Sequence, residues 1–463
     1  MSELCALPGH ALAELVEAGG ASVGAIVTAH LARIRAHDGR LGAFTDLLAE
    51  RALARAASLD ADPRPRPLKG VPFAVKNLFD IEGLPTRAGS RINRTRPPAV
   101  RDATAIRRLE AAGAVLLGAL NMGEYAYDFT GRNCHDGPSL NPHDPGRMTG
   151  GSSGGSGAAV AAGFAPLALG SDTNGSIRVP ASFCGLFGLK PSYGRLSRGG
   201  SFPFVASLDH VGPLARSVRD LALVHDAWIG ADPDDPVVPR SPAPPVLPGL
   251  EQGIAGLQIA VLDGWFVQNA QPEALAALEH VAGALDARRR VRLEGAEAVR
   301  AAAYLITMAE GAALHRERLR SRAPEFDPEV RDRLIAGLML PAHWVVTAQK
   351  LRRHVLEQAR EVFRSVDILL APATPCVAPL SGAKTMTLDG VEKPLRPNIG
   401  LFTQPISAIG LPVVAVPVRS VASLPIGVQV IAAPGRDDLA LRVARHLERT
   451  GAAQGGIAKG YDA

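Results

Sequence analysis

Two loops rich in serine and glycine carry the hydroxyl groups with which this sequence could attack a substrate. The first loop, MTGGSSGGSG, spans 148–157, and the second, GSDTNGSIRVP, spans 170–180. A Gly/Ser stretch is often a flexible linker, but the first loop leads directly into AAVAAGFAPLAL at 158–169, an apolar segment that must be buried. Two such loops joined by a short buried segment could bring their hydroxyls to one point, where acyl transfer is possible.

Other types of glycine-rich loop fit the first loop less well. A phosphate-binding P-loop needs a lysine after its glycines, and the dinucleotide fingerprint GxGxxG is not present. The GxSxG pattern of a nucleophile elbow is matched at Ser152 and at Ser153, so an α/β-hydrolase is an alternative. An elbow must follow a strand, however, and the preceding NPHDPGR predicts turns. The late histidines that such a fold needs also lie on predicted helices, at 343, 354 and 446.

A serine hydroxyl needs a base, and Lys76 is the candidate. Only 7 of the 50 basic residues are lysines, and Lys76 lies within VPFAVKN, which predicts a buried strand. A lysine can lose its proton inside a protein, whereas an arginine cannot. To act as a base near neutral pH, Lys76 needs its pKa lowered from about 10.4 to about 7–8, which burial can achieve. The alternative is a lysine that snorkels to solvent or pairs with Asp80.

The turn TNGS in the second loop could bind the negative charge that develops during acyl transfer. Gly175 allows the backbone to approach a ligand closely, and successive backbone N–H groups at this turn could form an oxyanion hole. The second loop therefore provides a candidate anion site next to a candidate nucleophile.

The remaining sequence predicts the elements that position these residues. Helical periodicity is found at 8–60 (with Ser22 as an N-cap), 102–112 (with Asp102 as the cap), 217–228, 272–288, 297–320, 341–365 and 437–449. Strands are expected within 67–83 and at 114–120, 256–264, 367–373, 412–418 and 425–432. Continuous apolar strands separated by helices indicate an α/β protein with one large sheet covered by helices on both faces.

The bulk composition is that of a globular chain with a large core. The 463 residues are 47% hydrophobic and 21% charged, and the net charge of +5 is scattered rather than gathered in a nucleic-acid-binding stripe. The four cysteines are far apart, without metal-ligand spacing, which fits reduced thiols in a cytoplasmic protein. No signal peptide is visible, and no apolar run reaches the roughly 18 residues of a membrane span. We therefore expect a cytoplasmic protein without membrane or nucleic-acid contacts.

Together these residues resemble the amidase signature family of serine amide hydrolases. The resemblance rests on Lys76 and the two loops, in which Ser152 and Ser176 are 24 residues apart as in that family. It extends over LKGVPFAVKN, NMGEYAY, NPHDPGRMTGG, CGLFGLKPSYGRLSRGG, SLDHVGPLARSVRDLA and LPIGVQVIA. It implies a single amidase domain over 1–463 with a mixed sheet. We divide this domain into N-terminal helices (1–66), a catalytic core (67–230), a Pro-rich surface crossing (231–250) and the remainder of the sheet with its covering helices (251–463).

The resemblance also implies a role for each residue of the site. Ser176 resembles the nucleophile, Ser152 the proton-relaying serine whose peptide bond is cis in the family, and Lys76 the base. The family's oxyanion hole and substrate contacts fall on Thr173, Asn174, Gly175 and Ser153, with the N–H of Ser176 among the oxyanion donors. No metal ion or organic cofactor is required by this chemistry.

The resemblance to one subfamily implies a substrate class. DTNGSIRVP, FPFVASLDHVGP and TQPISAIGLP are most similar to catalytic subunits that hydrolyse 1-carboxybiuret in cyanuric acid degradation. This implies a small carboxylated, urea-like amide, release of ammonia, and an oligomer, a heterotetramer with a small helical accessory subunit. Asn174 stands where most family members have glycine; it is either a tolerated left-handed residue or a contact to a polar substrate.

Several side chains are candidates for the pocket wall. A carboxylated substrate calls for a cation, for which bidentate arginine fits best. Arg320, Arg132 and Arg396 are available, and nothing in the sequence selects among them. Tyr125 and Tyr127 could line the pocket or belong to the core.

Other functions remain as alternatives. One is the tRNA-dependent amidotransferase component that supplies ammonia from glutamine to aspartyl- or glutamyl-tRNA (its A chain), which shares SYGRLSRGG and SLDHVGP but is disfavoured by Asn174, by His210 and by the short chain. Others are a general amidase for small amides and a non-enzymatic scaffold, the latter disfavoured by the intact Lys76, Ser152 and Ser176.

Overall fold

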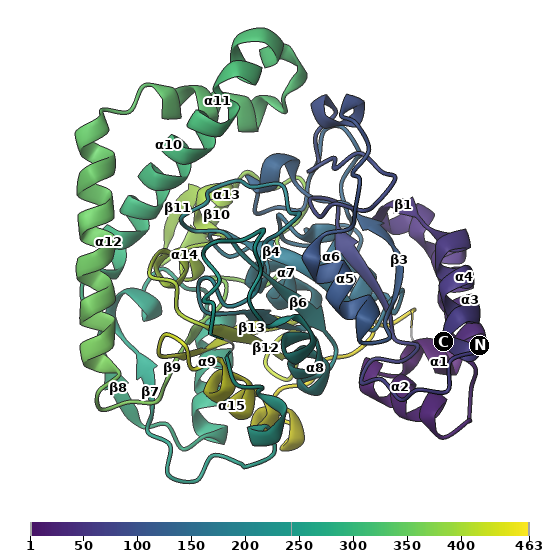
Figure 1. Cartoon of the computed structure of the whole chain (residues 1–463). Helices are drawn as coiled ribbons and strands as arrows, with labels where there is room; N and C mark the ends of the chain where they lie inside the picture. Colours follow the sequence, from purple (N-terminus) through teal and green to yellow (C-terminus); the bar gives the residue numbers. More distant parts are fainter. Residues whose placement is uncertain (1, 242, 462–463) are drawn as a thin grey trace.

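A single eleven-stranded sheet runs through the computed structural model, which describes residues 2–241 and 243–461 (Figure 1). Across the sheet the strands are β1 (Phe44–Leu47), β3 (Val115–Leu120), β2 (Pro72–Lys76), β4 (Leu167–Asp172), β6 (His210–Ala215), β5 (Phe187–Lys190), β12 (Val413–Val418), β13 (Ile426–Ala432), β9 (Ile368–Pro372), β7 (Ile259–Leu262) and β8 (Arg289–Val291). The pairs formed by β2 with β3 and β4, and by β7 with β8 and β9, are parallel, and the other pairs are antiparallel. The sheet is therefore mixed, as expected.

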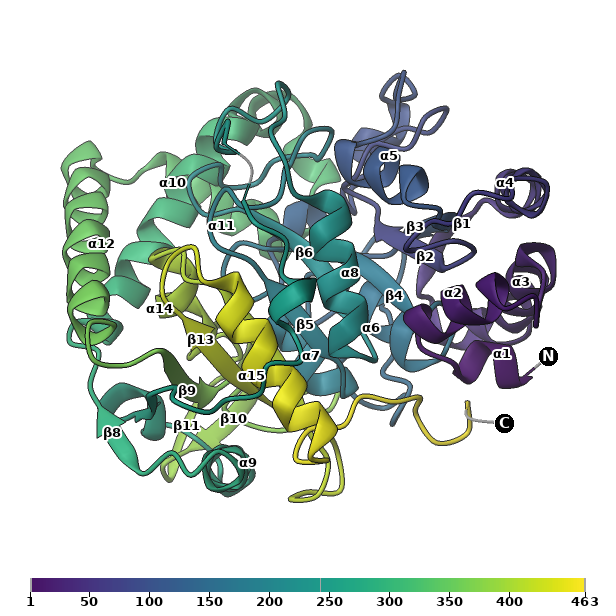
Figure 2. The ribbon, with the colours of Figure 1, turned by 60° about the horizontal axis from the view of Figure 1, so that its bottom comes forward.

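Helices pack on both faces of this sheet. On one face lie α5 (Thr104–Ala111), α8 (Val218–Trp228) and α15 (Asp437–Arg449), and Figure 2 shows α8 and α15 crossing the strands. On the other face lie α3 (Val23–Leu41), α4 (Ala49–Asp60), α6 (Gly154–Ala161) and α7 (Arg178–Cys184). The strands between them are buried on both sides, which is why they are continuous apolar runs in the sequence.

A third group of helices stands at one side of the molecule. It consists of α10 (Ala296–Arg322), α11 (Pro328–Leu338) and α12 (Ala342–Val362), which pack on one another (Figure 1). The short helices α13 (Leu395–Asn398) and α14 (Thr403–Ala408) follow in sequence, and α14 packs against α10. The remaining elements are α1 (Ser2–Ala6), α2 (Gly9–Glu17), α9 (Pro272–Ala284) and the hairpin of β10 (Thr385–Leu388) with β11 (Val391–Pro394). No helix of the described chain is long and apolar enough to cross a membrane.

The single mixed sheet with helices on both faces confirms the predicted fold class, whereas several local expectations need correction. Ser22 caps α3 as predicted and accepts a hydrogen bond from the N–H of Ala25 at 3.0 Å. The helical stretch 8–60, in contrast, is interrupted by β1. Asp102 does not cap α5, because its carboxylate is bound by Arg51 and by the N–H of Glu82. Helix α11 was not expected, and the strand within 67–83 is confined to β2.

Candidate active site

Lys76, the last residue of β2, lies at the centre of the candidate site. Its side chain is completely buried, and its Nζ donates to the hydroxyls of Ser152 at 2.7 Å and of Ser171 at 2.8 Å. Burial lowers the pKa of Lys76 to about 7, although Asp172 and two other aspartates counteract part of this effect. The lysine neither snorkels nor pairs with Asp80, whose carboxylate binds Thr86. It therefore exists near neutral pH as a mixture of amine and ammonium.

The first serine loop is fixed on both sides of Ser152. The peptide bond between Gly151 and Ser152 is cis. The N–H of Gly151 donates to the carbonyl of Phe129 at 2.9 Å, and the carbonyl of Ser152 accepts from the N–H of Gly123 at 3.1 Å. A side chain at position 151 would place its Cβ 2.7 Å from the Asp128 carboxylate, so only glycine fits there. These contacts hold the Ser152 hydroxyl beside Lys76.

The second serine loop is clamped by a buried ion pair. Asp172 at the end of β4 binds Arg178 at the start of α7, with Nε to Oδ2 at 2.9 Å and Nη2 to Oδ1 at 3.0 Å. Its Oδ2 also accepts from the N–H of Ile177 at 3.2 Å. Burial alone would raise the pKa of Asp172, but the Arg178 guanidinium outweighs it and holds the pKa well below its usual range. The clamp closes the turn 173–176, so its backbone is fixed before any substrate arrives.

Gly175 lies at the tightest point of this turn. Its φ of +143° favours glycine, and a Cβ there would lie 2.2 Å from the hydroxyl oxygen of Thr403 on α14. The Thr403 hydroxyl instead donates to the carbonyl of Asn174 at 2.7 Å. Within the described chain, the N–H groups of Asn174, Gly175 and Ser176 donate to no other residue. Such free backbone donors are what an oxyanion hole requires.

Ser176 reaches a pocket of about 190 Å³ next to this turn. The residue is only 3% exposed, and no hydrogen bond holds its hydroxyl among the residues that the structure describes. The pocket is lined by Ala126, Tyr127, Asp128, Phe129, Thr173, Asn174, Ser176, Phe204, Tyr304, Thr307, Arg333, Arg396, Pro397 and Gln404. The wall facing the serine loops therefore comes from the helices α10, α11, α13 and α14.

Two arginines of this wall differ in how their charge is balanced. Arg396 binds Asp128 at 2.6 Å and also pairs with Glu329, so two carboxylates neutralise it. Arg333 donates to the backbone carbonyls of Glu329 and Tyr127, and its guanidinium lies 3.7 Å from the centre of the Tyr127 ring. In the described part of the chain no carboxylate pairs with Arg333, so it contributes a net positive charge to the pocket.

The predicted site residues are brought together with four exceptions. Thr173, Asn174, Ser176 and Tyr127 line the pocket, but Ser153 does not, because its hydroxyl is bound to the backbone of Ser171. Tyr125 is a core residue whose ring packs at a tilt against His315, Phe202 and Phe326. Arg320 lies exposed on α10, where it pairs with Glu317, and Arg132 is also exposed outside the pocket.

Sequence reasoning missed three functional positions. Ser171 provides the second hydroxyl at Lys76, and its place in GSDTNGS, five residues before Ser176, was the available signal. Asp128 closes the turn that follows it by accepting hydrogen bonds from the N–H groups of Thr130 and Gly131, and it lines the pocket. Arg333 gave no signal, because it is one of the many arginines of the chain and lies on a helix that was not expected. Among the described residues, no cluster of three or more His, Cys, Asp or Glu side chains could hold a metal ion.

Comparison with known proteins establishes the family. The Amidase family model matches residues 25–441. The chain is 53% identical over 448 residues to AtzE, a 1-carboxybiuret hydrolase chain of Pseudomonas sp. (strain ADP), covering 95% of this chain and 98% of that relative. It is 38% identical over 485 residues to the A component of the glutamyl-tRNA(Gln) amidotransferase of Anaeromyxobacter dehalogenans (strain 2CP-C), covering 96% of each.

A solved structure agrees with these relatives. A chain of a solved structure, described as a vestigial protein complex that reveals the evolutionary origins of an s-triazine catabolic enzyme, superposes with a TM-score of 0.95 and 52% identity over 97% of this chain and 99% of that one. The chain belongs to the amidase family, and the resemblance to amidase signature enzymes is confirmed. It is thus an enzyme of a family that hydrolyses amide C–N bonds.

Proposed function

We propose that the chain hydrolyses a small carboxylated, urea-like amide such as 1-carboxybiuret through an acyl-enzyme on Ser176. The observation that carries the chemistry is the buried Lys76, whose Nζ contacts two hydroxyls and whose pKa of about 7 makes the neutral amine available. An amine held on a serine hydroxyl is the arrangement that general-base catalysis needs.

The reaction follows from these positions. As the Ser176 oxygen bonds to the amide carbonyl carbon, its proton passes through the Ser152 hydroxyl to Lys76. The N–H groups of Asn174, Gly175 and Ser176 stabilise the oxyanion. Collapse of the tetrahedral intermediate breaks the C–N bond, and the proton returns from Lys76 through Ser152 to the leaving nitrogen, which departs as ammonia. Water then attacks the acyl-enzyme by the same route and frees Ser176.

Arg333 is our candidate for binding the substrate carboxylate. Its charge is not neutralised by a protein carboxylate, and it lies on the pocket wall formed by α11, across from the serine loops. Arg396 is less suitable, because Asp128 and Glu329 already occupy its guanidinium. A charge-assisted hydrogen bond from Arg333 would contribute roughly 1.5–3 kcal/mol to binding.

Asn174 is our candidate for a hydrogen bond to the nitrogen-rich part of the substrate. Its side-chain nitrogen donates to the Thr307 hydroxyl at 2.9 Å, while its buried Oδ1 has no partner among the described residues. A buried acceptor without a partner costs about 1–3 kcal/mol, which a substrate N–H would recover. This favours the interpretation of Asn174 as a substrate contact.

We further propose that the chain works in an oligomer, a heterotetramer with a small helical accessory subunit. The support is the similar chain whose solved structure is described as a vestigial protein complex. Co-expression with a candidate small helical chain, followed by size-exclusion chromatography with light scattering, tests this association. Elution of the catalytic chain alone, under conditions in which both chains are folded, would contradict it.

Ammonia release by the purified chain, with and without the small partner, tests the proposed reaction. The substrates are freshly prepared 1-carboxybiuret, biuret as its match without the carboxylate, glutamine and simple amides. We expect rapid release from 1-carboxybiuret and slow release from biuret. Release from glutamine alone would identify an amidotransferase component, and release from simple amides alone a general amidase; either result would overturn the proposed substrate.

A further inference from the structure

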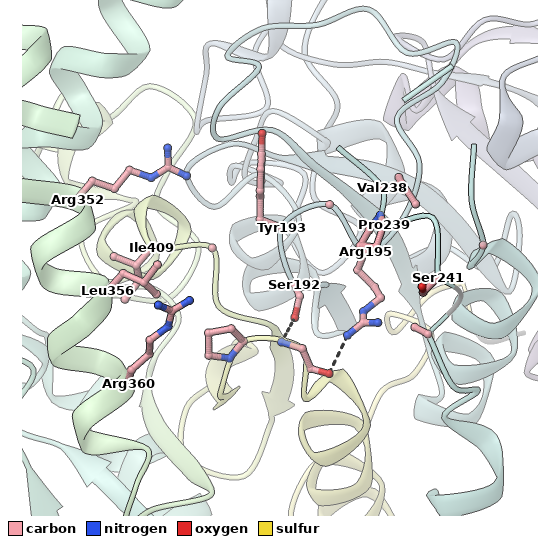
Figure 3. Close-up of a pocket in the computed structure, with 16 residues that line it drawn as sticks. Ser192, Tyr193, Arg195, Val238, Pro239, Ser241, Arg352, Leu356, Arg360 and Ile409 are labelled. Carbon is pink, nitrogen blue, oxygen red and sulfur yellow. Dashed lines mark hydrogen bonds between the residues drawn. The ribbon is translucent and has the colours of Figure 1, made fainter. Parts of the chain in front are cut away.

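A second pocket, of about 450 Å³, is drawn in Figure 3. It lies at the other end of α14 from the active-site pocket. Gln404 near the start of α14 lines the active-site pocket, whereas Ile409 and Gly410, directly after the helix, line the second one. Its other walls are α12, the loop 192–195, the turn 434–435 and part of the Pro-rich segment 231–250. At this volume the pocket is in the range of small-molecule sites.

Among the residues that the structure describes, three arginines and no carboxylate line this pocket. Arg352 and Arg360 lie two helical turns apart on the same face of α12, with Leu356 between them. Figure 3 shows these three side chains extending from α12 on one side of the pocket, with Arg195 on the opposite side. The positive groups therefore come from two separate elements and face a common space.

The three arginines differ in how their charge is balanced. Arg195 pairs with the buried Asp437 at 3.3 Å and donates to the carbonyl of Gly435 at 2.8 Å, so its charge is largely compensated. Arg360 pairs with Glu357 on the exposed surface of α12, where such pairs are weak. Arg352 has no carboxylate partner in the described chain; it donates to the backbone carbonyls of Ala408 and Ser207. Burial lowers the pKa of Arg352, as expected for a desolvated cation without a paired anion.

The pocket also offers apolar surface. Leu356, Ile409, Val238 and Pro434 line it, together with Tyr193, whose ring lies 5.9 Å from the Arg352 guanidinium. A hydrated inorganic ion would leave this surface uncovered, whereas an anion attached to an apolar body would use both kinds of wall.

We propose that this pocket is a second ligand site, which binds a small organic anion with its carboxylate or phosphate group at Arg352 and Arg360 and its apolar body against Leu356 and Ile409. The site is separate from the reaction at Ser176. It is joined to that reaction by α14, because Arg352 binds the carbonyl of Ala408 at the helix end while Thr403 at the helix start supports the turn at Asn174. Its occupancy is therefore expected to alter turnover.

The probes for this site are 4-bromobenzoate and 4-bromophenyl phosphate, which distinguish a carboxylate from a phosphate ligand. Crystals of the full chain are soaked with each compound, and the anomalous signal of bromine locates it. Isothermal titration then measures affinity in the Arg333→Gln background, which removes the active-site arginine that has no carboxylate partner among the described residues. We expect bromine density beside Leu356 and saturable binding of at least one probe.

Two variants on α12 decide whether the arginines bind the anion. Arg360→Glu reverses a charge at the pocket without touching the backbone contacts of Arg352 and is expected to weaken binding at least tenfold. Arg353→Glu, at an exposed neighbour outside the pocket, is the matched control and should leave binding unchanged. No saturable binding at about 10 mM of either probe, equal binding by both variants, or bromine located elsewhere would overturn the proposal. Turnover that saturating probe leaves unchanged would refute the link through α14.

Discussion

Two buried lysines flank Asp172, and they differ in what their amines touch. Both Lys76 and Lys190 are fully buried, and burial lowers the pKa of each to about 7. Lys76 Nζ contacts the hydroxyls of Ser152 and Ser171 beside the pocket. Lys190 Nζ donates to the carbonyl of Pro191 at 3.0 Å, and the nearby Arg178 lowers its pKa further.

The difference shows that a lowered pKa is not enough to identify a base. Desolvation acts on both amines alike, because both lie inside the same sheet. Only Lys76 has a hydroxyl through which a proton could reach a substrate, and Lys190 lines neither of the two pockets described above. We therefore propose Lys76 as the catalytic base and Lys190 as a structural residue near Asp172, whose charge is already paired with Arg178.

The largest expected effect is that of Ser176→Ala. Removing the attacking oxygen should lower ammonia release by about 10⁴-fold or more while the fold is retained. The measurement is steady-state turnover, with circular dichroism as the check on folding. A fluorophosphonate probe should label the wild-type chain at Ser176 and leave the variant unlabelled; labelling at Ser152 instead would exchange the two serine roles.

Substituting the two lysines tests the comparison directly. Lys76→Ala should reduce kcat by about 10³-fold, and Lys76→Arg equally, because arginine cannot give up its proton. Lys190→Met should keep turnover within about tenfold of the wild type, since no proton passes through it. Equal losses in Lys76→Ala and in a folded Lys190→Met would show that the contacts of the amine do not separate the two lysines.

The variant Arg333→Gln tests how the substrate carboxylate is bound rather than how the amide bond is broken. We expect KM for 1-carboxybiuret to rise about 10–100-fold, the loss of one charge-assisted contact, while turnover of neutral biuret is unchanged. The matched control is Arg320→Gln on the exposed surface of α10. An equal loss of activity on both substrates would indicate that Arg333 supports the pocket structure and does not bind the carboxylate.

The pH dependence of kcat/KM should follow the protonation of Lys76 alone. Protonated Lys76 cannot accept a proton, so kcat/KM should fall about tenfold per pH unit below about 7 and level off above it. Lys190→Met should leave the midpoint of this profile in place. A midpoint that moves by a full unit in Lys190→Met would mean that the two amines titrate together.

The smallest effect concerns stability. Each lysine binds its proton more weakly in the folded chain, with a pKa of about 7, than at its ordinary value of 10.5. The unfolded chain then binds more protons between these values, so stability should rise with pH across that window. Lys190→Met should make the rise shallower, as measured by urea unfolding near neutral pH and near pH 9, whereas an exposed control, Lys350→Met, should leave it unchanged.

The sequence allowed the chemistry to be predicted more fully than the pocket. Lys76, Ser152 and Ser176 stand in segments whose composition is unusual for their surroundings, such as a lysine within VPFAVKN, so each gave a local signal. The prediction that Ser153 contacts the substrate was wrong, because the direction of its hydroxyl depends on how α6 packs against β4. Arg333 could not be selected, because its place in the pocket depends on the packing of α11 against α10, a contact between separate helices.

The fold, too, could be predicted only where the signal is local in the sequence. The buried strands were identified where apolar runs are continuous, as in β12 and β13, since both faces of the sheet are covered. The short edge strand β1 was missed, because its four half-buried residues gain their strand conformation by pairing with β3. Asp102 was predicted to cap the helix that follows it, but its carboxylate binds Arg51, which is distant in the sequence.

The separate origins of the two halves of the active site have a consequence for evolution. The groups assigned to bond breaking come from residues 76–178, whereas Tyr304, Thr307, Arg333, Arg396 and Gln404 come from a later part of the chain. Mutations in the later part can therefore change which amide is accepted while the hydrolytic machinery is inherited intact. A lineage built on this arrangement can acquire new nitrogen sources by revising that wall, and an engineer's substrate-switching library would cover the pocket positions of the segment 300–404 together with Asn174.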